Sequence, residues 1–313
     1  MSAGTPSTSP VVTDAVIVRP SPLIQRVVDY AEMCRPRIAM MTMISVSTGF
    51  VLASPIVIEW SVLAVALAGI LQLVASSSIL NQVLETRTDA RMLRTADRPL
   101  VAGRISAAEA SMVGLLLGVS GTIVLAIYSN PATTVAGLLT LLLYVVAYTP
   151  LKTRSTLCTT VGAVPGAMPP VLGWLAAGGA LDSGALALFA LLFVWQFPHF
   201  LAIGWIYRRD YEGAGLKMLP SFSDGGCRAA IVATVYAIAF VPVSLLPSYA
   251  GLTGQIYFGT ALVLSVIYLL ATLRFAFDRT TARGRRLLLV SLAILPVLML
   301  VMVAEFLHLT VPG

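Results

Sequence analysis

Residues Asn81 to Leu100 read NQVLETRTDARMLRTADRPL, a passage from the end of an apolar segment into a basic loop. If a helix continues past Asn81, Glu85 and Asp89 follow at i+4 and i+8, so the three side chains share one face over about 12 Å. The two carboxylates repel each other as an i, i+4 pair, and neither has a Lys or Arg three or four residues away. We therefore expect cations from other parts of the chain to pair with them.

Composition places this stretch in a membrane protein. The chain has 313 residues, of which 58% are hydrophobic and 11% are charged, and a soluble domain of this length cannot bury so much apolar surface. Apolar segments long enough to span a bilayer recur along the chain. We predict an all-α polytopic membrane protein with nine transmembrane helices, near residues 38–57, 61–81, 110–128, 132–149, 157–178, 184–206, 229–247, 254–273 and 287–306.

The positive charges give an independent test of this topology. All 20 Lys and Arg residues precede the first expected helix or lie in every second loop, and the other loops hold none. By the positive-inside rule, the N-terminus and the loop after Asn81 are cytoplasmic and the C-terminus lies on the far side. The net charge of +6 therefore reports topology. Basic residues spread over several loops do not form the single stripe typical of nucleic-acid binding.

The N-terminal region carries two expectations. Residues 1–30 are expected to form a flexible cytoplasmic tail, because residues 1–25 are rich in Ser, Thr, Pro and Val, and residues 31–313 are expected to form a single transmembrane domain. Arg35-Pro36-Arg37 enters the first helix, where Pro is tolerated in the opening turn. We interpret this tripeptide as a positive-inside anchor.

Two later segments are unusual for membrane helices. The fourth helix ends at YTPLKTRST, residues 148–156, where Pro150 stops the helix and leaves Lys152 and Arg154 facing the cytoplasm. The fifth carries GAVPGAMPPVLGW, residues 162–174, whose Pro and Gly residues free backbone polar groups that only neighbouring helices or a cavity can satisfy. We expect a bend or a close helix contact there.

The sixth helix holds FVWQFPHF, residues 193–200, and leads into DYEGAGLKMLP, residues 210–220. If the helix is continuous, Gln196, His199 and Asp210 share one face, with His199 about 16 Å deeper than Asp210. A His within a membrane span is a candidate functional residue, although a hydrogen bond to a neighbouring helix would also account for it. Gly213 and Gly215 give the following loop freedom to close over a ligand.

The residue types indicate one kind of chemistry. If the acidic pair stood alone, a solvated helix end would explain it. Two carboxylates together with an amide oxygen also suit Mg²⁺ that is held jointly with substrate phosphates. The neighbouring Arg and Lys residues suit phosphate oxygens, Arg through its bidentate fork and Lys as a point charge. Because the surroundings are apolar helices, the phosphorylated substrate is expected to have a long lipid tail. The combination indicates prenyl diphosphate chemistry.

Over about residues 30–306 the chain resembles the UbiA-type intramembrane prenyltransferases, and within them the branch that farnesylates heme B. Three motif groups carry the resemblance: NQVLETRTD with MLRTADRPLVAGRIS, YTPLK with GAVPGAMPPVLGW, and WQFPHF with DYEGAGLKMLP. The resemblance implies nine helices around a central cavity and Mg²⁺-dependent ionisation of farnesyl diphosphate. A vinyl group of heme B then attacks the farnesyl cation, water completes the product, heme O, and diphosphate leaves.

The resemblance also implies roles for individual residues. Two departures bear on these roles: many members have Asp where Glu85 stands, and the family more often has adjacent Lys-Arg where this chain has Lys152-Thr153-Arg154. The second acidic motif offers Asp210 followed by Ala214, whereas quinone and chlorophyll prenyltransferases tend to have two aspartates, which favours a porphyrin acceptor. The implied catalytic residues are Asn81, Glu85, Asp89, Lys152 and Asp210; the implied metal ligands are Asn81, Glu85, Asp89 and Asp210; and the implied substrate-binding residues are Arg94, Arg98, Arg154, His199, Gln196 and Tyr148.

Our hypothesis for His199 is that it ligates or orients the heme iron. The resemblance further implies a multi-pass protein of the cell inner membrane, with heme A synthase or oxidase assembly proteins as candidate partners. Three alternatives stay open: a prenyltransferase acting on an aromatic quinone precursor, a transporter with carboxylates and a His in broken helices, and a non-enzymatic heme-binding protein. Only the first of these consumes a prenyl diphosphate.

Overall fold

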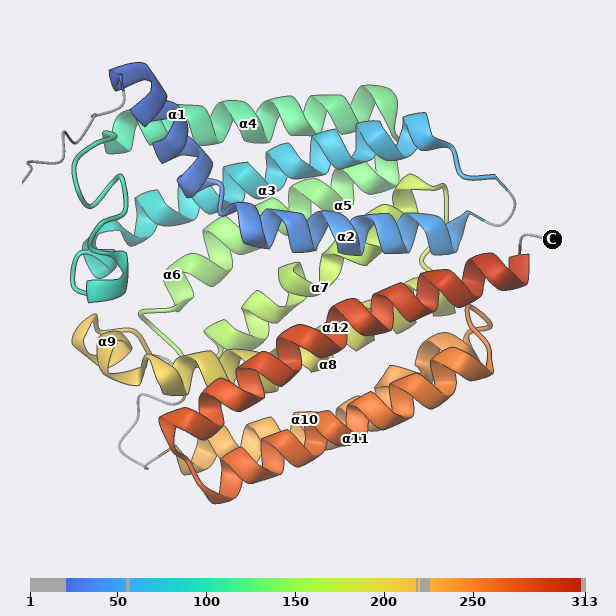
Figure 1. Ribbon diagram of the computed structural model, residues 1–313. Helices are drawn as coiled ribbons and strands as arrows, with labels where there is room; N and C mark the ends of the chain where they lie inside the picture. Colours follow the sequence, from blue (N-terminus) through green and yellow to red (C-terminus); the bar gives the residue numbers. More distant parts are fainter. Residues whose placement is uncertain (1–20, 55–56, 218, 220–225, 311–313) are drawn as a thin grey trace, which may run out of the picture.

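The computed structural model describes residues 21–54, 57–217, 219 and 226–310 (Figure 1). Regular structure in these residues is entirely helical, which confirms the predicted all-α class. The long helices are α2 (Pro36–Ala53), α3 (Trp60–Asp89), α4 (Ala107–Tyr128), α5 (Pro131–Leu142), α7 (Cys158–Ala176), α8 (Ser183–Ile206), α10 (Cys227–Tyr249), α11 (Gln255–Phe277) and α12 (Thr281–Thr310). The shorter ones are α1 (Pro22–Met33), η1 (Leu93–Thr95), η2 (Leu143–Tyr148), α6 (Thr149–Leu151) and α9 (Arg208–Gly213).

Each long helix overlaps one of the nine predicted spans, and in the described part of the chain eight are long and apolar enough to cross a membrane. The α5 helix reaches that length because it continues through η2 and α6 to Leu151. The α7 helix is not among the eight, since Pro165, Pro169 and Pro170 and its glycines dilute its apolar residues. It nevertheless lies inside the bundle against α2 and α8. The chain is therefore an integral membrane protein, with a span count close to the nine predicted.

The α2 and α7 helices meet backbone to backbone. A Cβ atom at Gly49 would lie 1.8 Å from the carbonyl oxygen of Pro170, and one at Gly173 would lie 1.9 Å from that of Val46. Glycine is the residue that permits two membrane helices to approach this closely. The close helix contact predicted for residues 162–174 is confirmed.

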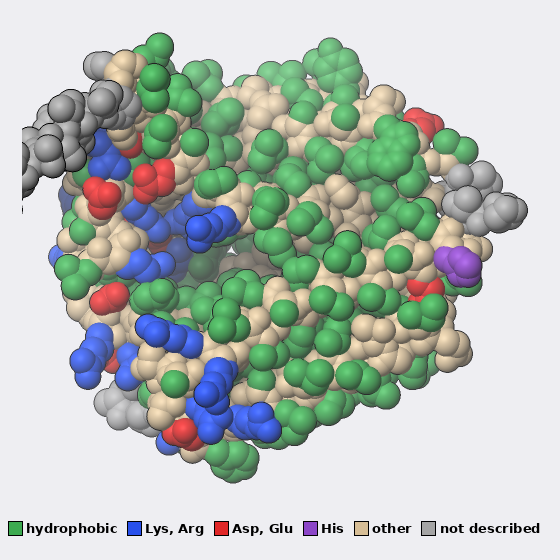
Figure 2. Space-filling model, viewed as in Figure 1, with side chains coloured by type: hydrophobic (Ala, Val, Ile, Leu, Met, Phe, Trp, Pro, Cys, Tyr) green, Lys and Arg blue, Asp and Glu red, His purple; other side chains and the backbone are tan. Residues whose placement is uncertain are grey.

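Two groups of helices pack on the α2–α7 pair (Figure 1). The α3, α4 and α5 helices form one group, and α8, α10, α11 and α12 form the other. The larger hydrophobic cluster lies in the second group, around Phe240, Tyr257 and Tyr268. Figure 2 shows Lys and Arg side chains gathered at one end of the bundle, which we call the basic end. This gathering agrees with the expected alternation of basic and non-basic loops.

The expected flexible tail needs a correction. Residues 22–30 belong to α1, which begins at Pro22 after the N-cap Ser21. The helix is tied to the basic end of the bundle, because Tyr30 donates a hydrogen bond to Glu109 at 3.1 Å and Arg104 pairs with Asp29 at 2.9 Å. The rest of the expected tail, residues 1–20, lies outside the described residues.

Candidate active site

The α3 helix continues past Asn81 to Asp89, as predicted, and both of these side chains are buried. The cations that the acidic pair requires come from two other elements. Lys152, after α6, donates to Glu85 with an Nζ–Oε1 distance of 2.6 Å. Arg98, in the loop after η1, pairs with Asp89 through its guanidinium. Each acid on the face is thus neutralised by a cation distant in the chain or beyond the helix end.

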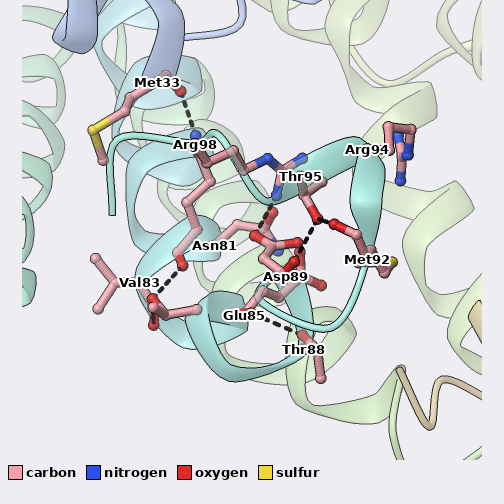
Figure 3. Close-up of polar contacts among 12 residues, drawn as sticks. Met33, Asn81, Val83, Glu85, Thr88, Asp89, Met92, Arg94, Thr95 and Arg98 are labelled. Atoms are coloured by element: carbon pink, nitrogen blue, oxygen red, sulfur yellow. Dashed lines mark hydrogen bonds and ion pairs between the residues drawn. The ribbon is translucent and has the colours of Figure 1, made fainter. Parts of the chain in front are cut away.

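Local hydrogen bonds fold the loop back over the end of α3. The buried Thr95 hydroxyl donates to the backbone oxygen of Asp89 at 2.8 Å, and the Arg98 amide donates to the backbone oxygen of Thr95 at 3.1 Å. Pro99 follows and cannot continue a helix. The loop therefore holds the Arg98 guanidinium against Asp89, as Figure 3 shows.

A π-helical segment, η2, delivers Lys152. Its wider turn precedes Pro150, which has no amide hydrogen for a regular helical bond. Thr149 donates to the backbone oxygen of Tyr144 at 2.9 Å and accepts a hydrogen bond from Asn81 at 3.0 Å. The Lys152 ammonium lies 4.5 Å from the centre of the Tyr148 ring. The predicted Lys152 and the unpredicted Thr149 thus contact α3, while the ring of the predicted Tyr148 lies between Lys152 and Gly162 of α7.

Arg35 is a site residue that our sequence interpretation missed. Its guanidinium donates to the Asn81 side-chain oxygen at 3.1 Å, which makes it more than a membrane anchor. It is the one non-glycine residue with positive φ (51°) in the described part of the chain, and it precedes Pro36 at the start of α2. A left-handed conformation costs a non-glycine residue about 1–3 kcal/mol, and it persists where the surroundings fix it. The sequence carries no local signal for this contact, because Asn81 lies 46 residues after Arg35.

A cavity of about 300 Å³ opens beside these residues at the basic end. Figure 2 shows a hollow at this end, bordered by Lys and Arg side chains. The side chains lining the cavity are Glu32, Arg35, Ile38, Gln82, Arg94 and Arg98. Three guanidinium groups around one cavity favour a ligand with several negative charges. Ile38, from the start of α2, adds an apolar side.

Arg94 is held by aromatic residues and not by the acids. Its guanidinium lies 4.8 Å from the centre of the Tyr207 ring and 5.8 Å from that of Tyr211. In Figure 3 it lies apart from Glu85 and Asp89, and it is exposed. Arg94 is therefore available to an anion entering the cavity.

The cations of the site influence one another. Burial, and then the neighbouring Arg35, lower the pKa of Arg98, while Asp89 and Glu85 oppose this shift. Burial alone would lower the pKa of Lys152, but the oxygens of Tyr148 and Glu85 outweigh it and the pKa is raised. Both groups stay protonated near neutral pH, Arg98 because an arginine starts far above it. Repulsion between Arg35 and Arg98 favours an anion between them.

One sequence expectation about Asp210 is wrong. The α8 helix ends at Ile206, and Tyr207 separates it from α9, so Asp210 does not continue the helical face of Gln196 and His199. The α9 segment still borders the site, since Tyr211 packs against Met92 and the Lys217 amide donates to the Lys152 backbone oxygen at 2.8 Å.

Asp210 itself is half-buried. Among the described residues, no three His, Cys, Asp or Glu side chains lie close enough together to hold a metal ion, so Asp210 does not join Glu85 and Asp89. Its role as a ligand stays a prediction.

The remaining predicted residues lie elsewhere. Gln196 is buried and donates to the backbone oxygens of Ala163 and Leu192, at 3.2 and 3.0 Å. His199 is buried on the same helix, stacked on Trp195 with 4.8 Å between ring centres. Arg154, two residues after Lys152, is exposed. Their proposed roles toward substrate stay predictions.

The acidic pair fits a metal ion that a substrate helps to hold. Glu85 uses Oε1 and Asp89 uses Oδ2 for their cations, so within the described structure the second oxygen of each carboxylate has no hydrogen bond. Mg²⁺ is commonly bound by one or two carboxylates together with substrate phosphates and water. Asn81 differs, because its oxygen is engaged by Arg35. Two free carboxylate oxygens beside an arginine-lined cavity suit such a shared site.

Comparison with known proteins adds to this geometry. The model of the UbiA prenyltransferase family matches residues 42–303, which is most of the chain. The chain belongs to the UbiA prenyltransferase family. A relative of this UbiA prenyltransferase, the protoheme IX farnesyltransferase of Solibacter usitatus, is 39% identical over 280 residues, covering 86% of this chain and 96% of the relative.

Solved structures share the fold of this UbiA prenyltransferase. A structure of digeranylgeranylglyceryl phosphate synthase has a TM-score of 0.73 at 15% identity and covers 91% of this chain and 99% of its own. A UbiA homolog from Archaeoglobus fulgidus, bound to GPP and Mg²⁺, has a TM-score of 0.60 at 17% identity and covers 89% of this chain and 99% of its own. At these identities the likeness establishes the shared helical fold.

Proposed function

We propose that this prenyltransferase transfers the farnesyl group of farnesyl diphosphate to a vinyl group of heme B. A vinyl carbon bonds to C1 of the farnesyl group as the C–O bond to diphosphate breaks. Water adds at the neighbouring carbon with loss of a proton, which gives the hydroxyethylfarnesyl chain of heme O and free diphosphate. The observation that carries the proposal is the paired acidic face of α3 beside an arginine-lined cavity, in a chain 39% identical to a protoheme IX farnesyltransferase.

The basic residues of the site would bind the diphosphate. Arg35, Arg94 and Arg98 line the cavity, and Lys152 lies beside Glu85. Donors fixed where negative charge develops lower the barrier to breaking the C–O bond, because they need no rearrangement during the reaction. A divalent cation held by Glu85 and Asp89 with the substrate would supply further positive charge at the leaving diphosphate. The apolar helices would shield the farnesyl cation from early attack by water.

His199 has the correct protonation pattern to meet the iron of the acceptor. The Ser291 hydroxyl has one hydrogen, and its 2.7 Å contact to the Leu288 backbone oxygen uses it, because a carbonyl can only accept. The 2.7 Å contact between Ser291 Oγ and His199 Nδ1 must then be donated by the His. Nε2 of the neutral ring is left with its lone pair, which is the form that binds a metal. This supports the proposal that His199 ligates or orients heme iron.

We propose the cell inner membrane as the location, with the N-terminus and the basic end in the cytoplasm, on the basis of the charge distribution. Cys227 is exposed at the basic end and provides a test. A membrane-impermeant maleimide should label it in inside-out vesicles and not in intact spheroplasts. Labelling in intact spheroplasts and not in inside-out vesicles would show that the protein has the opposite orientation. Heme A synthase or oxidase assembly proteins would be the partners that receive the product.

The deciding experiment is mass spectrometry of hemes extracted after purified protein is incubated with heme B, farnesyl diphosphate and Mg²⁺. We expect a farnesylated, hydrated heme that disappears when EDTA is added. Unchanged heme together with prenylation of an aromatic quinone precursor would contradict the proposed acceptor. Consumption of neither substrate by a folded preparation would favour heme binding or transport.

A further inference from the structure

A second cavity at the basic end lies outside the candidate active site. It has a volume of about 340 Å³ and opens between the last turns of α11 and the first turns of α12. We call it the α11–α12 cavity. Its lining consists of Ala271 and Arg274 from α11 and Arg283, Arg286, Leu289 and Val290 from α12. None of these residues has a role in the farnesyl transfer described above.

Positive charge at this cavity is poorly compensated. Within the described residues, Arg274 and Arg286 form no ion pair, and Arg283 is paired only with the exposed Asp278, at 3.4 Å. An exposed pair of this kind contributes little. The first turn of α12 contains no acidic residue, although the helix dipole favours negative charge there and opposes the arginines. An anion at the cavity would relieve both the repulsion among the arginines and their conflict with the dipole.

The positive-inside rule explains why arginines occupy this end, but it does not place three of them around one cavity. Figure 2 shows Lys and Arg side chains gathered over the ends of α11 and α12, next to hydrophobic side chains. Basic cavities between membrane helices are suited to the phosphate groups of lipids.

The remaining wall of the cavity is apolar and continues along the outside of the bundle. Ala271, Leu289 and Val290 form this wall, and Leu289 is 65% exposed. Toward the membrane, Ile267 on α11 and Leu292 on α12 extend the exposed apolar surface. A free phosphate ion would use the arginines but leave this wall uncovered. An anionic headgroup attached to a hydrocarbon chain matches both parts.

We propose that the α11–α12 cavity binds one anionic glycerophospholipid. The lipid phosphate lies among Arg274, Arg283 and Arg286, and an acyl chain runs along Ala271, Leu289 and Val290. The headgroup acts as the missing counter-ion of the α12 N-terminus and holds the ends of α11 and α12 together. The proposal does not depend on the identity of the prenyl acceptor.

The test uses the purified full-length protein in neutral detergent with dioleoyl phosphatidylglycerol or dioleoyl phosphatidylcholine. Native mass spectrometry measures how much lipid stays bound. Arg286→Gln removes a lining charge, and Arg285→Gln is the matched control, since Arg285 is an exposed neighbour that does not line the cavity. Leu289→Trp fills the apolar part without changing charge, and Leu300→Trp, exposed farther along α12, is its control.

We expect retention of phosphatidylglycerol to fall about fivefold in Arg286→Gln, the effect of one basic residue near an anionic lipid. It should fall in Leu289→Trp as well, and stay at the wild-type level in both controls. Phosphatidylcholine should be retained poorly by every protein. The circular dichroism spectrum and gel-filtration profile of Arg286→Gln should equal those of the wild type, which shows that the variant is folded.

Several outcomes would overturn the proposal. Equal losses in Arg286→Gln and Arg285→Gln would show a diffuse charge effect, and equal retention of both lipids would show that the headgroup does not matter. Displacement of the lipid by millimolar inorganic phosphate, with Leu289→Trp unaffected, would indicate a phosphate site. Displacement by farnesyl diphosphate would indicate a second prenyl diphosphate site.

Discussion

Lys152 and Glu85 are joined by a 2.6 Å contact across 67 residues of sequence. The contact links the corner after α6 to the acidic face of α3, and both side chains are largely buried, at 13% and 12% exposure. Because neither charge has much water around it, removal of one partner leaves the other poorly compensated. This pair therefore connects the stability of the helix bundle to the chemistry of the site.

Removal of one or both charges of this pair separates its effect on stability from its effect on activity. We expect Glu85→Gln and Lys152→Met each to lose most turnover, roughly 100-fold, because each removes a fixed charge from the proposed diphosphate site. The double variant should regain thermal stability relative to either single variant without regaining activity. Thermal unfolding in detergent and the heme mass assay provide the measurements. Thermal stability of all three variants equal to that of the wild type would show that the pair is energetically unimportant.

Asp89→Asn tests the metal role of the second acid. The amide keeps the size of the side chain and can still accept a hydrogen bond from Arg98, but it lacks the negative charge that a divalent ion requires. We expect turnover at least about 100-fold lower and a higher Mg²⁺ concentration for half-maximal rate. Asp97→Asn is the control, because Asp97 is exposed and pairs only with Arg104 at the surface. Near-normal activity of Asp89→Asn would refute the metal role.

Two substitutions of Arg35 distinguish its side chain from its backbone. Arg35→Gly keeps the left-handed conformation without strain, whereas Arg35→Gln keeps a polar side chain in the strained conformation. Because a hydrogen bond to a charged group contributes about 1.5–3 kcal/mol, both should raise the KM for farnesyl diphosphate roughly tenfold or more. Arg37→Gln, exposed near the same helix start, should leave KM unchanged. A normal KM for Arg35→Gly would show that the Arg35 guanidinium does not bind farnesyl diphosphate.

The His199 proposal predicts a spectroscopic change. We expect His199→Ala to shift the Soret band of bound heme and weaken heme binding. Ser291→Ala should have a smaller effect in the same direction, because it removes the partner that fixes Nδ1–H. His308→Ala, on the same helix as Ser291 but in its last turn, should change nothing. An unchanged Soret band in His199→Ala would show that the ring contacts Ser291 for structural reasons alone.

Gly173→Ala tests the contact between α2 and α7. The new Cβ would lie 1.9 Å from the Val46 carbonyl oxygen, so the helices must separate. Overpacking of a tight core costs about 1–3 kcal/mol, and we expect a lower thermal unfolding temperature. Gly259→Ala is the control, since a Cβ there has no neighbour within 4 Å. Unchanged stability of Gly173→Ala would mean that the helix pair adapts easily.

Features that depend on local periodicity could be predicted from the sequence. The acidic face of α3 and its need for external cations follow from helix geometry, and the glycines and prolines of α7 indicated a close contact. Glycine patterns and carboxylate spacing carry this information because they act over one or two turns. Which cation would reach which acid depended on tertiary packing.

Other features had no readable signal. Arg35 lies where the chain bends between α1 and α2 in a left-handed conformation and contacts Asn81 there, whereas a basic residue before Pro normally suggests a membrane anchor. No Gly or Pro lies between the end of α8 at Ile206 and Asp210, so a continuous face through Asp210 was a reasonable but wrong extrapolation. Helix breaks set by packing are not visible in periodicity.

The pairing of each acid with its own cation also bears on the order of events. Before any ligand arrives, Lys152 and Arg98 pair with Glu85 and Asp89 and neutralise the acidic pair. A metal ion arriving alone at the free carboxylate oxygens would meet acids whose charge is already compensated, with the positive charges of Lys152 and Arg98 beside it. Under the proposed function, diphosphate arriving with the metal would give Lys152 and Arg98 phosphate oxygens to pair with, and the carboxylates would then be available to the metal. We therefore expect calorimetry to detect little heat with Mg²⁺ alone and strong, mutually dependent binding when both are present.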